Sequence, residues 1–326
     1  MNLPYSEVIH SGDIQPISLV QQGVLPHTKE RYRTFESLSA SLRQALHIRD
    51  YQITKDRYIV LSDVHKGSRQ ANTDEFLHNE RLYCHALRYY ADQGYRLVLN
   101  GDIEEGWKLD YHKIIESYED TAFAAEREFA RQGPQFYHRI FGNHDQDWAD
   151  PGKVARYLKP VLGPVNVYPA IILGSRIVIT HGHQGDPHSD QGARLSRFVV
   201  RHLWRPVQRI TGLSMLQDAA NHILYWAREQ HLAEWARVNR LLLIAGHTHR
   251  PMLNVRAANE PPAYYVNNGC CVHLDGITGL EIDEGEIRLV KWGQPQDAVS
   301  KIPAAKIDPQ RVIFQSTDLG AMLARL

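Results

Sequence analysis

Five short apolar runs, each followed directly by a polar turn, constrain the fold of this chain more than any other feature of its sequence. They are separated by longer stretches in which apolar residues recur every three or four positions, such as residues 74–93 and 116–132. The short runs are typical of buried strands and the longer stretches of helices. This alternation predicts an α/β architecture with covered, mixed sheets. The runs with their turns are YIVLSDVH, RLVLNGD, FYHRIFGNHD, RIVITHGH and LLLIAGHTH.

Every one of these runs ends in residue types that bind metal ions. Taken singly, a strand-end Asp is more often a turn or helix cap, and a buried His is more often a hydrogen-bonded core residue. Taken together, they predict one site, because loops beyond the carboxyl ends of neighbouring strands converge. The residues are Asp63, His65, Asp102, Asn143, His144, His181, His183, His247 and His249.

The composition narrows the compartment and the kind of metal. Of the 326 residues, 18 are histidines, the commonest protein metal ligand. The three cysteines, Cys84, Cys270 and Cys271, fit neither a disulfide framework nor a thiolate zinc site, which favours a reducing, cytoplasmic compartment. Nitrogen and oxygen ligands without thiolate suit Mn, Fe or Zn. The sequence has no signal-peptide pattern and no membrane-spanning apolar stretch, so we expect neither export nor insertion.

The ordered series DVH, NGD, GNHD, THGH and GHTH resembles the calcineurin-like metallophosphoesterase superfamily over roughly residues 57–293. That resemblance implies a four-layer αββα sandwich and a site for two divalent ions, with Mn favoured by analogy and Fe or Zn as alternatives. It implies that one ion is held by Asp63, His65 and His249, the other by Asn143, His181 and His247, and that Asp102 bridges both. His183 follows the same strand as His181, so the sequence leaves their roles interchangeable; we expect His181 to be the ligand.

The mechanism implied by the resemblance is in-line attack on phosphorus by a hydroxide that bridges the metals. His144 resembles the family's catalytic histidine, which stabilises the phosphoryl group or protonates the leaving oxygen. Asp145 is a candidate for orienting His144, and a role as helix cap is almost as well supported.

A helical cap is predicted to be inserted at about residues 186–240. Arginines at helical spacing form a stripe there, which is either a solvated basic face or a phosphate-recognition surface. Its placement is similar to that of the lid of UDP-2,3-diacylglucosamine diphosphatases, although those enzymes typically have Arg where this chain has His144. The candidate substrate-binding residues are His183, Arg194, Arg197, Arg201 and Asn268.

The ends of the chain carry no chemical motif. Residues 1–54 are predicted to be an extension with one helix, residues 55–293 the metallophosphoesterase domain, and residues 294–326 a polar tail with a short final helix. Basic and aromatic residues in the cap also suit peripheral contact with the inner face of a membrane.

Three functions remain in competition. The first is hydrolysis of a small or lipid-linked phosphate or pyrophosphate. The second is a nuclease or cyclic-nucleotide phosphodiesterase of the same superfamily; equal numbers of basic and acidic residues, 37 each, speak mildly against nucleic acid. The third is a non-catalytic metal-binding scaffold, against which the complete ligand set argues. The sequence does not fix the oligomeric state.

Overall fold

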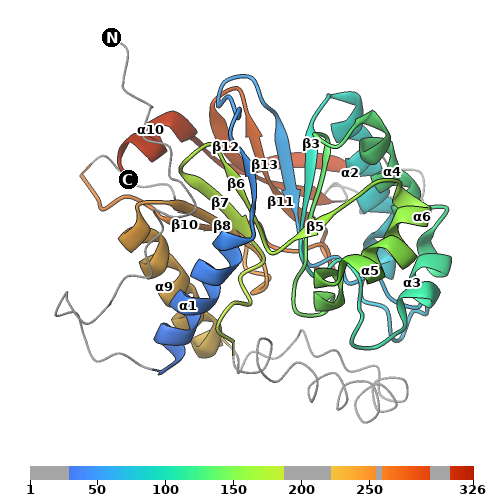
Figure 1. The fold of residues 1–326 in the computed structure, drawn as a ribbon. Helices are drawn as coiled ribbons and strands as arrows, with labels where there is room; N and C mark the ends of the chain where they lie inside the picture. The colour runs from blue at the N-terminus through green and yellow to red at the C-terminus, as the bar shows by residue number, and fades with distance from the viewer. Residues whose placement is uncertain (1–28, 187–221, 255–258, 294–308) are drawn as a thin grey trace.

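Two β-sheets lie face to face between two layers of helices (Figure 1). The computed structural model describes residues 29–186, 222–254, 259–293 and 309–326. All five predicted runs are strands, and they are divided between the sheets: three in the larger sheet and two in the smaller. The expectation of an αββα sandwich is therefore confirmed.

The larger sheet has the strand order β13-β12-β11-β2-β3-β4-β5. Its central strands β2, β3, β4 and β5 run parallel, and β11, β12 and β13 extend it antiparallel from β2. The strands are β2 (Tyr58–Leu61), β3 (Arg96–Asn100), β4 (Tyr137–Ile140), β5 (Val167–Tyr168), β11 (Ile277–Asp283), β12 (Glu286–Gly293) and β13 (Gln310–Asp318).

The smaller sheet has the order β1-β6-β7-β8-β10-β9. Strands β7, β8 and β10 are parallel, so the turns after β7 and β8 leave the same edge of the sheet. The strands are β1 (Leu46–Ile48), β6 (Ala170–Leu173), β7 (Ile177–Thr180), β8 (Leu242–Ala245), β9 (Met252–Leu253) and β10 (Tyr265–Asn267).

Helices cover the outer face of each sheet. Two long helices pack on each other and on the smaller sheet: α1 (Lys29–Arg43) and α9 (His222–Asn239). The helical layer on the larger sheet consists of η2 (Leu77–Asn79), α2 (Glu80–Asp92), α3 (Tyr111–Tyr118), α4 (Ala122–Gln132), η3 (Gln146–Ala149), α5 (Pro151–Lys153), η4 (Val154–Leu158) and α6 (Lys159–Leu162). A short last helix, α10 (Leu319–Ala324), packs near β12 and β13.

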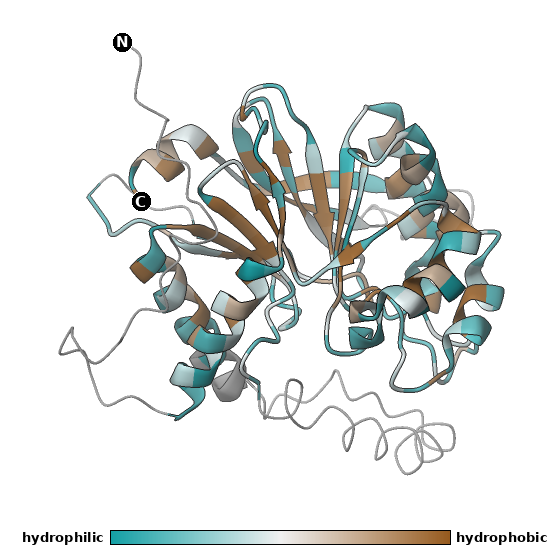
Figure 2. Cartoon of the chain, viewed as in Figure 1, coloured by the Kyte–Doolittle hydropathy of each residue, from teal (hydrophilic) through white to brown (hydrophobic). Residues whose placement is uncertain are grey.

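The period-two pattern of the strands explains the layers. In β2, Tyr58 and Val60 point into the core between the sheets, whereas Ile59 and Leu61 point into the core beneath the helices. Alternate side chains of one strand therefore belong to different cores, and both cores are apolar because both faces of the sheet are covered. Figure 2 shows the same pattern, with hydrophobic strands inside and hydrophilic residues on the outer surfaces of the helices.

The two ends of the described chain belong to the sandwich rather than to appendages. Helix α1 and strand β1 lie in the segment predicted as an extension, yet β1 pairs with β6 and α1 packs on the same layer. Strand β13, in the predicted polar tail, pairs along β12, and the expected final helix is α10. Strand β13 escaped sequence reasoning because most of its residues are exposed, so it lacks an apolar alternation.

The predicted cap is described only at its C-terminal part. Residues 187–221 lie outside the described residues, and with them Arg194, Arg197 and Arg201. Helix α9 lies in the C-terminal part of the predicted cap. Its Leu232 and Trp235 are buried in the core with α1.

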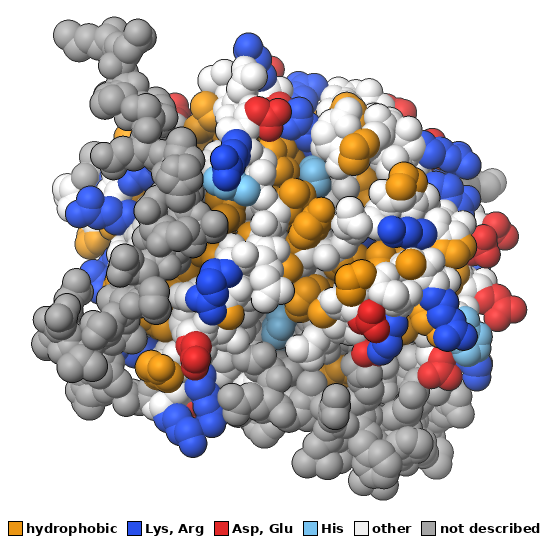
Figure 3. Space-filling view, viewed as in Figure 1, with side chains coloured by type: hydrophobic (Ala, Val, Ile, Leu, Met, Phe, Trp, Pro, Cys, Tyr) orange, Lys and Arg blue, Asp and Glu red, His pale blue; other side chains and the backbone are white. Residues whose placement is uncertain are grey.

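The described surface is of mixed charge on the face seen in Figure 3, where basic and acidic side chains are interspersed. No helix in the described part of the chain is long and apolar enough to cross a membrane.

Candidate metal centre

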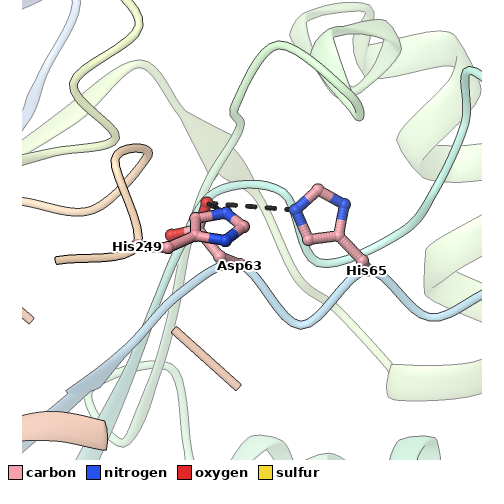
Figure 4. Close-up of side chains that lie close together, drawn as sticks. All are labelled: Asp63, His65 and His249. Carbon is pink, nitrogen blue, oxygen red and sulfur yellow. Dashed lines mark ion pairs between the residues drawn. The ribbon is translucent and has the colours of Figure 1, made fainter. Parts of the chain in front are cut away.

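The strand-end loops bring the predicted ligands into two adjoining clusters. In the first, Asp63 Oδ1 lies 3.0 Å from His249 Nε2 and 4.0 Å from His65 Nε2 (Figure 4). These three residues follow β2 and β8, which belong to different sheets. The site is therefore built across the junction of the two sheets.

The second cluster contains Asp102, His181 and His247. Asp102 Oδ2 lies 3.1 Å from His181 Nε2 and 4.0 Å from His65 Nε2. His65 is a member of the first cluster, so one oxygen of Asp102 faces both. This is the position that a bridging carboxylate requires.

Backbone strain is concentrated at the same residues. Of the eight non-glycine residues with positive φ in the described chain, five are predicted ligands. Such a conformation costs about 1–3 kcal/mol each and persists where surrounding contacts enforce it. Here backbone hydrogen bonds enforce it at Asp63, whose N–H donates to Gly101 O at 3.0 Å, and at His65, whose N–H donates to Asp102 O at 2.9 Å. The five residues are Asp63, His65, Asp102, His247 and His249.

Four buried atoms of the candidate ligands have no hydrogen bond of good geometry in the described protein, although Asp63 Oδ1 and His181 Nε2 each lie within ion-pair distance of another candidate ligand. An orphaned buried polar atom costs about 1–3 kcal/mol, so native structures rarely leave several in one place. All four atoms have lone pairs that suit a divalent ion, which makes the donor set fit the metals that the fold implies. The atoms are Asp63 Oδ1, His65 Nε2, Asn143 Oδ1 and His181 Nε2.

The other ring nitrogens of two candidate ligands, His65 and His181, are held by hydrogen bonds within the protein. His65 Nδ1 lies 3.2 Å from Glu105 Oε2, and His181 Nδ1 lies 2.8 Å from the carbonyl oxygen of Asn100. Such contacts fix the tautomer in which Nδ1 carries the proton and Nε2 keeps its lone pair for the metal.

Glu105, which the sequence analysis did not single out, also contacts His144. Its Oε1 lies 2.7 Å from His144 Nδ1, and the Trp107 ring stacks on the His144 ring with centroids 4.1 Å apart. Burial alone would lower the pKa of His144, but the adjacent Glu105 carboxylate raises it above the ordinary value. The signal available in the sequence was a carboxylate three positions after Asp102, in the same turn.

Within the described chain Asp145 makes no hydrogen bond with the His144 ring; the carboxylate that contacts this ring belongs to Glu105. The Asp145 carboxylate instead accepts from the backbone N–H groups of Asp102, Ile103 and Gly142, at 3.2, 2.8 and 2.6 Å. Burial and the neighbouring Asp102 carboxylate raise the pKa of Asp145 to about 6. It precedes η3 but does not cap it with its side chain. Asp145 therefore joins the loops that carry Asp102 and Asn143.

The other predicted residues lie at different depths. His183 is buried with its ring 5.5 Å from that of His181, but the clusters include His181 and not His183. Asn268 is completely buried beside Ser62, with its amide 2.7 Å from Ser62 Oγ. Cys270 hydrogen-bonds the rings of His249 and His273; burial would raise the pKa of its thiol, but His249 and His273 lower it to about 6.

Comparison with known proteins agrees with this geometry. The model of the calcineurin-like phosphoesterase family matches residues 57–251. No curated protein matches the chain in sequence. Among solved structures, a single mutant of Vps29 from Entamoeba histolytica is similar at 14% identity and a TM-score of 0.34, over 79% of this chain and 99% of that one. That likeness is too low to add to the family match. Because the match spans all five strand-end motifs and more than half of the chain, this protein belongs to the calcineurin-like phosphoesterases, which are metal-dependent hydrolases.

Proposed function

We propose that this enzyme hydrolyses a phosphate ester or pyrophosphate bond with two divalent ions, and that its substrate is a small or lipid-linked phosphate. The observation that carries the proposal is that Asp102 Oδ2 faces candidate ligand atoms of both clusters, His65 Nε2 at 4.0 Å and His181 Nε2 at 3.1 Å, neither of which has a hydrogen bond of its own. Mn is the first choice of metal, and Fe or Zn would suit the same nitrogen and oxygen donors.

The ligand assignment follows the two clusters. Asp63, His65 and His249 would hold one ion, Asn143, His181 and His247 the other, and Asp102 both. When bound, the ions polarise phosphoryl oxygens and lower the pKa of water so that it can act as the nucleophile.

The chain's own contribution to proton transfer is His144. Glu105 holds His144 Nδ1, which leaves Nε2 to face a substrate, and the His144 side chain is 21% exposed, which gives it access to one. Because the pKa of His144 is raised, its ring stays protonated to higher pH and can donate a proton to the leaving oxygen. Trp107 limits rotation of the ring by stacking on it and by donating from Nε1 to Asn143 O at 2.7 Å.

The choice of substrate depends on the cap. Recognition of phosphate by Arg194, Arg197 and Arg201, and a nucleotide-sugar type of lipid precursor as substrate, are supported only by the residue types and placement of the insert. The basic and aromatic residues of the insert support peripheral contact with the inner face of the membrane, and the three cysteines support a cytoplasmic enzyme. His183 and Asn268 remain candidates for shaping the substrate site.

The main alternative is a nuclease or cyclic-nucleotide phosphodiesterase with the same metal centre. It predicts hydrolysis of diesters and, for a nuclease, a steep loss of binding with salt. A non-catalytic scaffold predicts metal binding without turnover.

A substrate panel separates these functions. The metal-free protein is loaded with Mn, Fe or Zn and assayed on p-nitrophenyl phosphate, bis-p-nitrophenyl phosphate and a UDP-linked pyrophosphate. Asp102→Ala should lose metal-dependent turnover, whereas Asp147→Ala, outside the clusters, should keep it. The substrate that is hydrolysed fastest shows whether the enzyme prefers a monoester, a diester or a pyrophosphate. Metal binding with no turnover on any substrate would favour the scaffold.

A further inference from the structure

Helix α9 presents an arginine directly to one metal ligand. Arg228 Nη1 lies 2.9 Å from His247 Nε2, and Arg228 Nη2 lies 2.9 Å from Asp186 Oδ1. The other Asp186 oxygen lies 3.6 Å from His247 Nε2. The three side chains thus form one group in which the guanidinium contacts both an imidazole and a carboxylate.

The next residue of α9 fixes the helix to the same loop. Glu229 Oε1 accepts from Thr248 Oγ1 at 2.7 Å, and Thr248 stands between the two histidines of the GHTH motif. Glu229 and Thr248 are both buried. The position of Arg228 beside His247 is therefore set by the docking of α9, not by a long side chain that reaches across solvent.

The contact between Arg228 and His247 is incompatible with a metal on His247. A guanidinium has donors only, so His247 Nε2 must accept, and the proton of the neutral ring is then on Nδ1. A metal needs a deprotonated ring nitrogen. If the metal binds Nδ1, the proton moves to Nε2, which then donates to Asp186; if it binds Nε2, it takes the place of Arg228. In both cases Arg228 Nη1 gives up His247 as its acceptor.

We propose that Arg228 is a phosphate ligand that metal binding makes available: Asp186 keeps hold of Nη2, and Nη1 turns from His247 to an oxygen of the substrate phosphoryl group. This inference rests on the proposed function and specifies its recognition of phosphate. The chemical class of the ligand is a terminal phosphate or pyrophosphate, because a guanidinium fork matches phosphoryl oxygens. Arg228 lies in α9, whereas the arginine stripe of the cap lies outside the described residues.

The test measures the binding of inorganic phosphate to Mn-loaded protein by calorimetry, after free metal has been removed. Arg228→Gln should weaken phosphate binding by about 10- to 100-fold, the range expected for a lost charged hydrogen bond, while Mn binding stays equal or becomes tighter. Arg228→Lys keeps the positive charge but loses the forked donor geometry, so its affinity for phosphate should lie between those of the wild type and Arg228→Gln. Arg237→Gln, at an exposed position on the same helix, should match the wild type.

Each outcome decides the proposal. Unchanged phosphate binding in Arg228→Gln overturns it, as does a loss that only follows weaker Mn binding. If Arg228→Gln fails to fold, Arg228→Lys decides alone by the same criterion. If the wild type turns over substrate and phosphate binding does not depend on Arg228, the proposed function stands and this inference fails. If phosphate binding depends on Arg228 but no substrate is turned over, this inference stands and the proposed function fails. Absence of metal binding by the wild type would reject both.

Discussion

Two clusters of buried charge share the loops that follow β2 and β3, and they differ in how their charges are matched. The inner cluster is built from Lys66, Glu104, Glu126 and Arg139, all fully buried. Lys66 Nζ lies 2.6 Å from Glu126 and 3.1 Å from Glu104, and Arg139 Nη2 lies 2.5 Å from Glu104. Two permanent cations here face two carboxylates, so the protein supplies the counter-charges itself.

The metal centre has no such match. The carboxylates of Asp63 and Asp102 face imidazole rings, whose charge depends on protonation, and several ligand lone pairs make no hydrogen bond in the described chain. Lys66 follows His65 directly, and Glu104 follows Asp102 by two positions. Neighbouring residues of one loop therefore serve opposite purposes: the inner cluster holds the loops together, and the outer one keeps negative charge and lone pairs for cations to bind.

The largest expected effect comes from the outer cluster. Asp102→Asn keeps the size of the side chain but removes the negative charge that faces the candidate ligands of both metal ions. Metals supply several kcal/mol of transition-state stabilisation, so kcat/KM on the preferred substrate should fall about 1000-fold or more. Burial would lower the pKa of His181, but Asp102 and Asp63 raise it to about 9, so without metal the variant should also lose some stability to urea in EDTA at neutral pH. An unchanged kcat/KM would contradict a role for Asp102 in metal-dependent hydrolysis.

The inner cluster should respond in the opposite way. Lys66→Met leaves Glu104 and Glu126 short of a buried cation, which costs about 3–5 kcal/mol of unfolding free energy. Urea denaturation measures it. Lys291→Met removes a lysine that pairs with the exposed Asp275, and should cost less than about 1 kcal/mol. Equal effects of the two substitutions would show that the buried pairs are not structural.

Glu105 contacts both a candidate ligand, His65, and the candidate proton donor, His144. Glu105→Gln should lower kcat about 10- to 100-fold, as loss of an outer-shell partner of a metal ligand typically does. Since Glu105 raises the pKa of His144, its loss lowers that pKa, and the alkaline limb of the kcat profile moves to lower pH as His144 deprotonates earlier. Glu128→Gln, at an exposed surface position, is the matched control. A fall in kcat without a shift of the alkaline limb would assign Glu105 to His65 alone.

The candidate ligands and the strands were predictable because both depend on local sequence. An apolar run predicts a strand, and metal-binding residue types stand in the turn after it, so Asp63 and His249 could be named as candidates without knowing their contacts. For Glu105 the only local signal was its place three positions after Asp102; its partners His65 and His144 are 40 and 39 residues away, and no local pattern marks that pairing. Arg228 could not be identified from the sequence either, because its contact with His247 depends on where α9 packs. Strand β1 was missed because it is three residues long and contains a His.

The smallest expected effect concerns a buried imidazole outside both clusters. Here too, a group that is buried without a counter-charge should be neutral. His138 on β4 is buried, and its Nε2 lies 3.0 Å from the carbonyl oxygen of Gln135. Burial lowers its pKa to about 4, and nearby Arg96 contributes in the same direction.

The sign of the pH dependence follows from that lowered pKa. Above the unfolded value of about 6.5 the ring is neutral in both states, and its contribution to stability is fully present. As the pH falls toward 4 the unfolded chain takes up a proton that the folded ring does not, so stability is lost across this window. At pH 5 the loss is about 2 kcal/mol, from roughly 1.4 kcal/mol per pKa unit. His138→Gln should flatten the slope of urea-unfolding free energy between pH 6.5 and 5 by about that amount. His78→Gln, at an exposed site, is the matched control. An unaltered slope in His138→Gln would mean that this ring is charged in the folded protein, and that burial at this depth does not enforce neutrality.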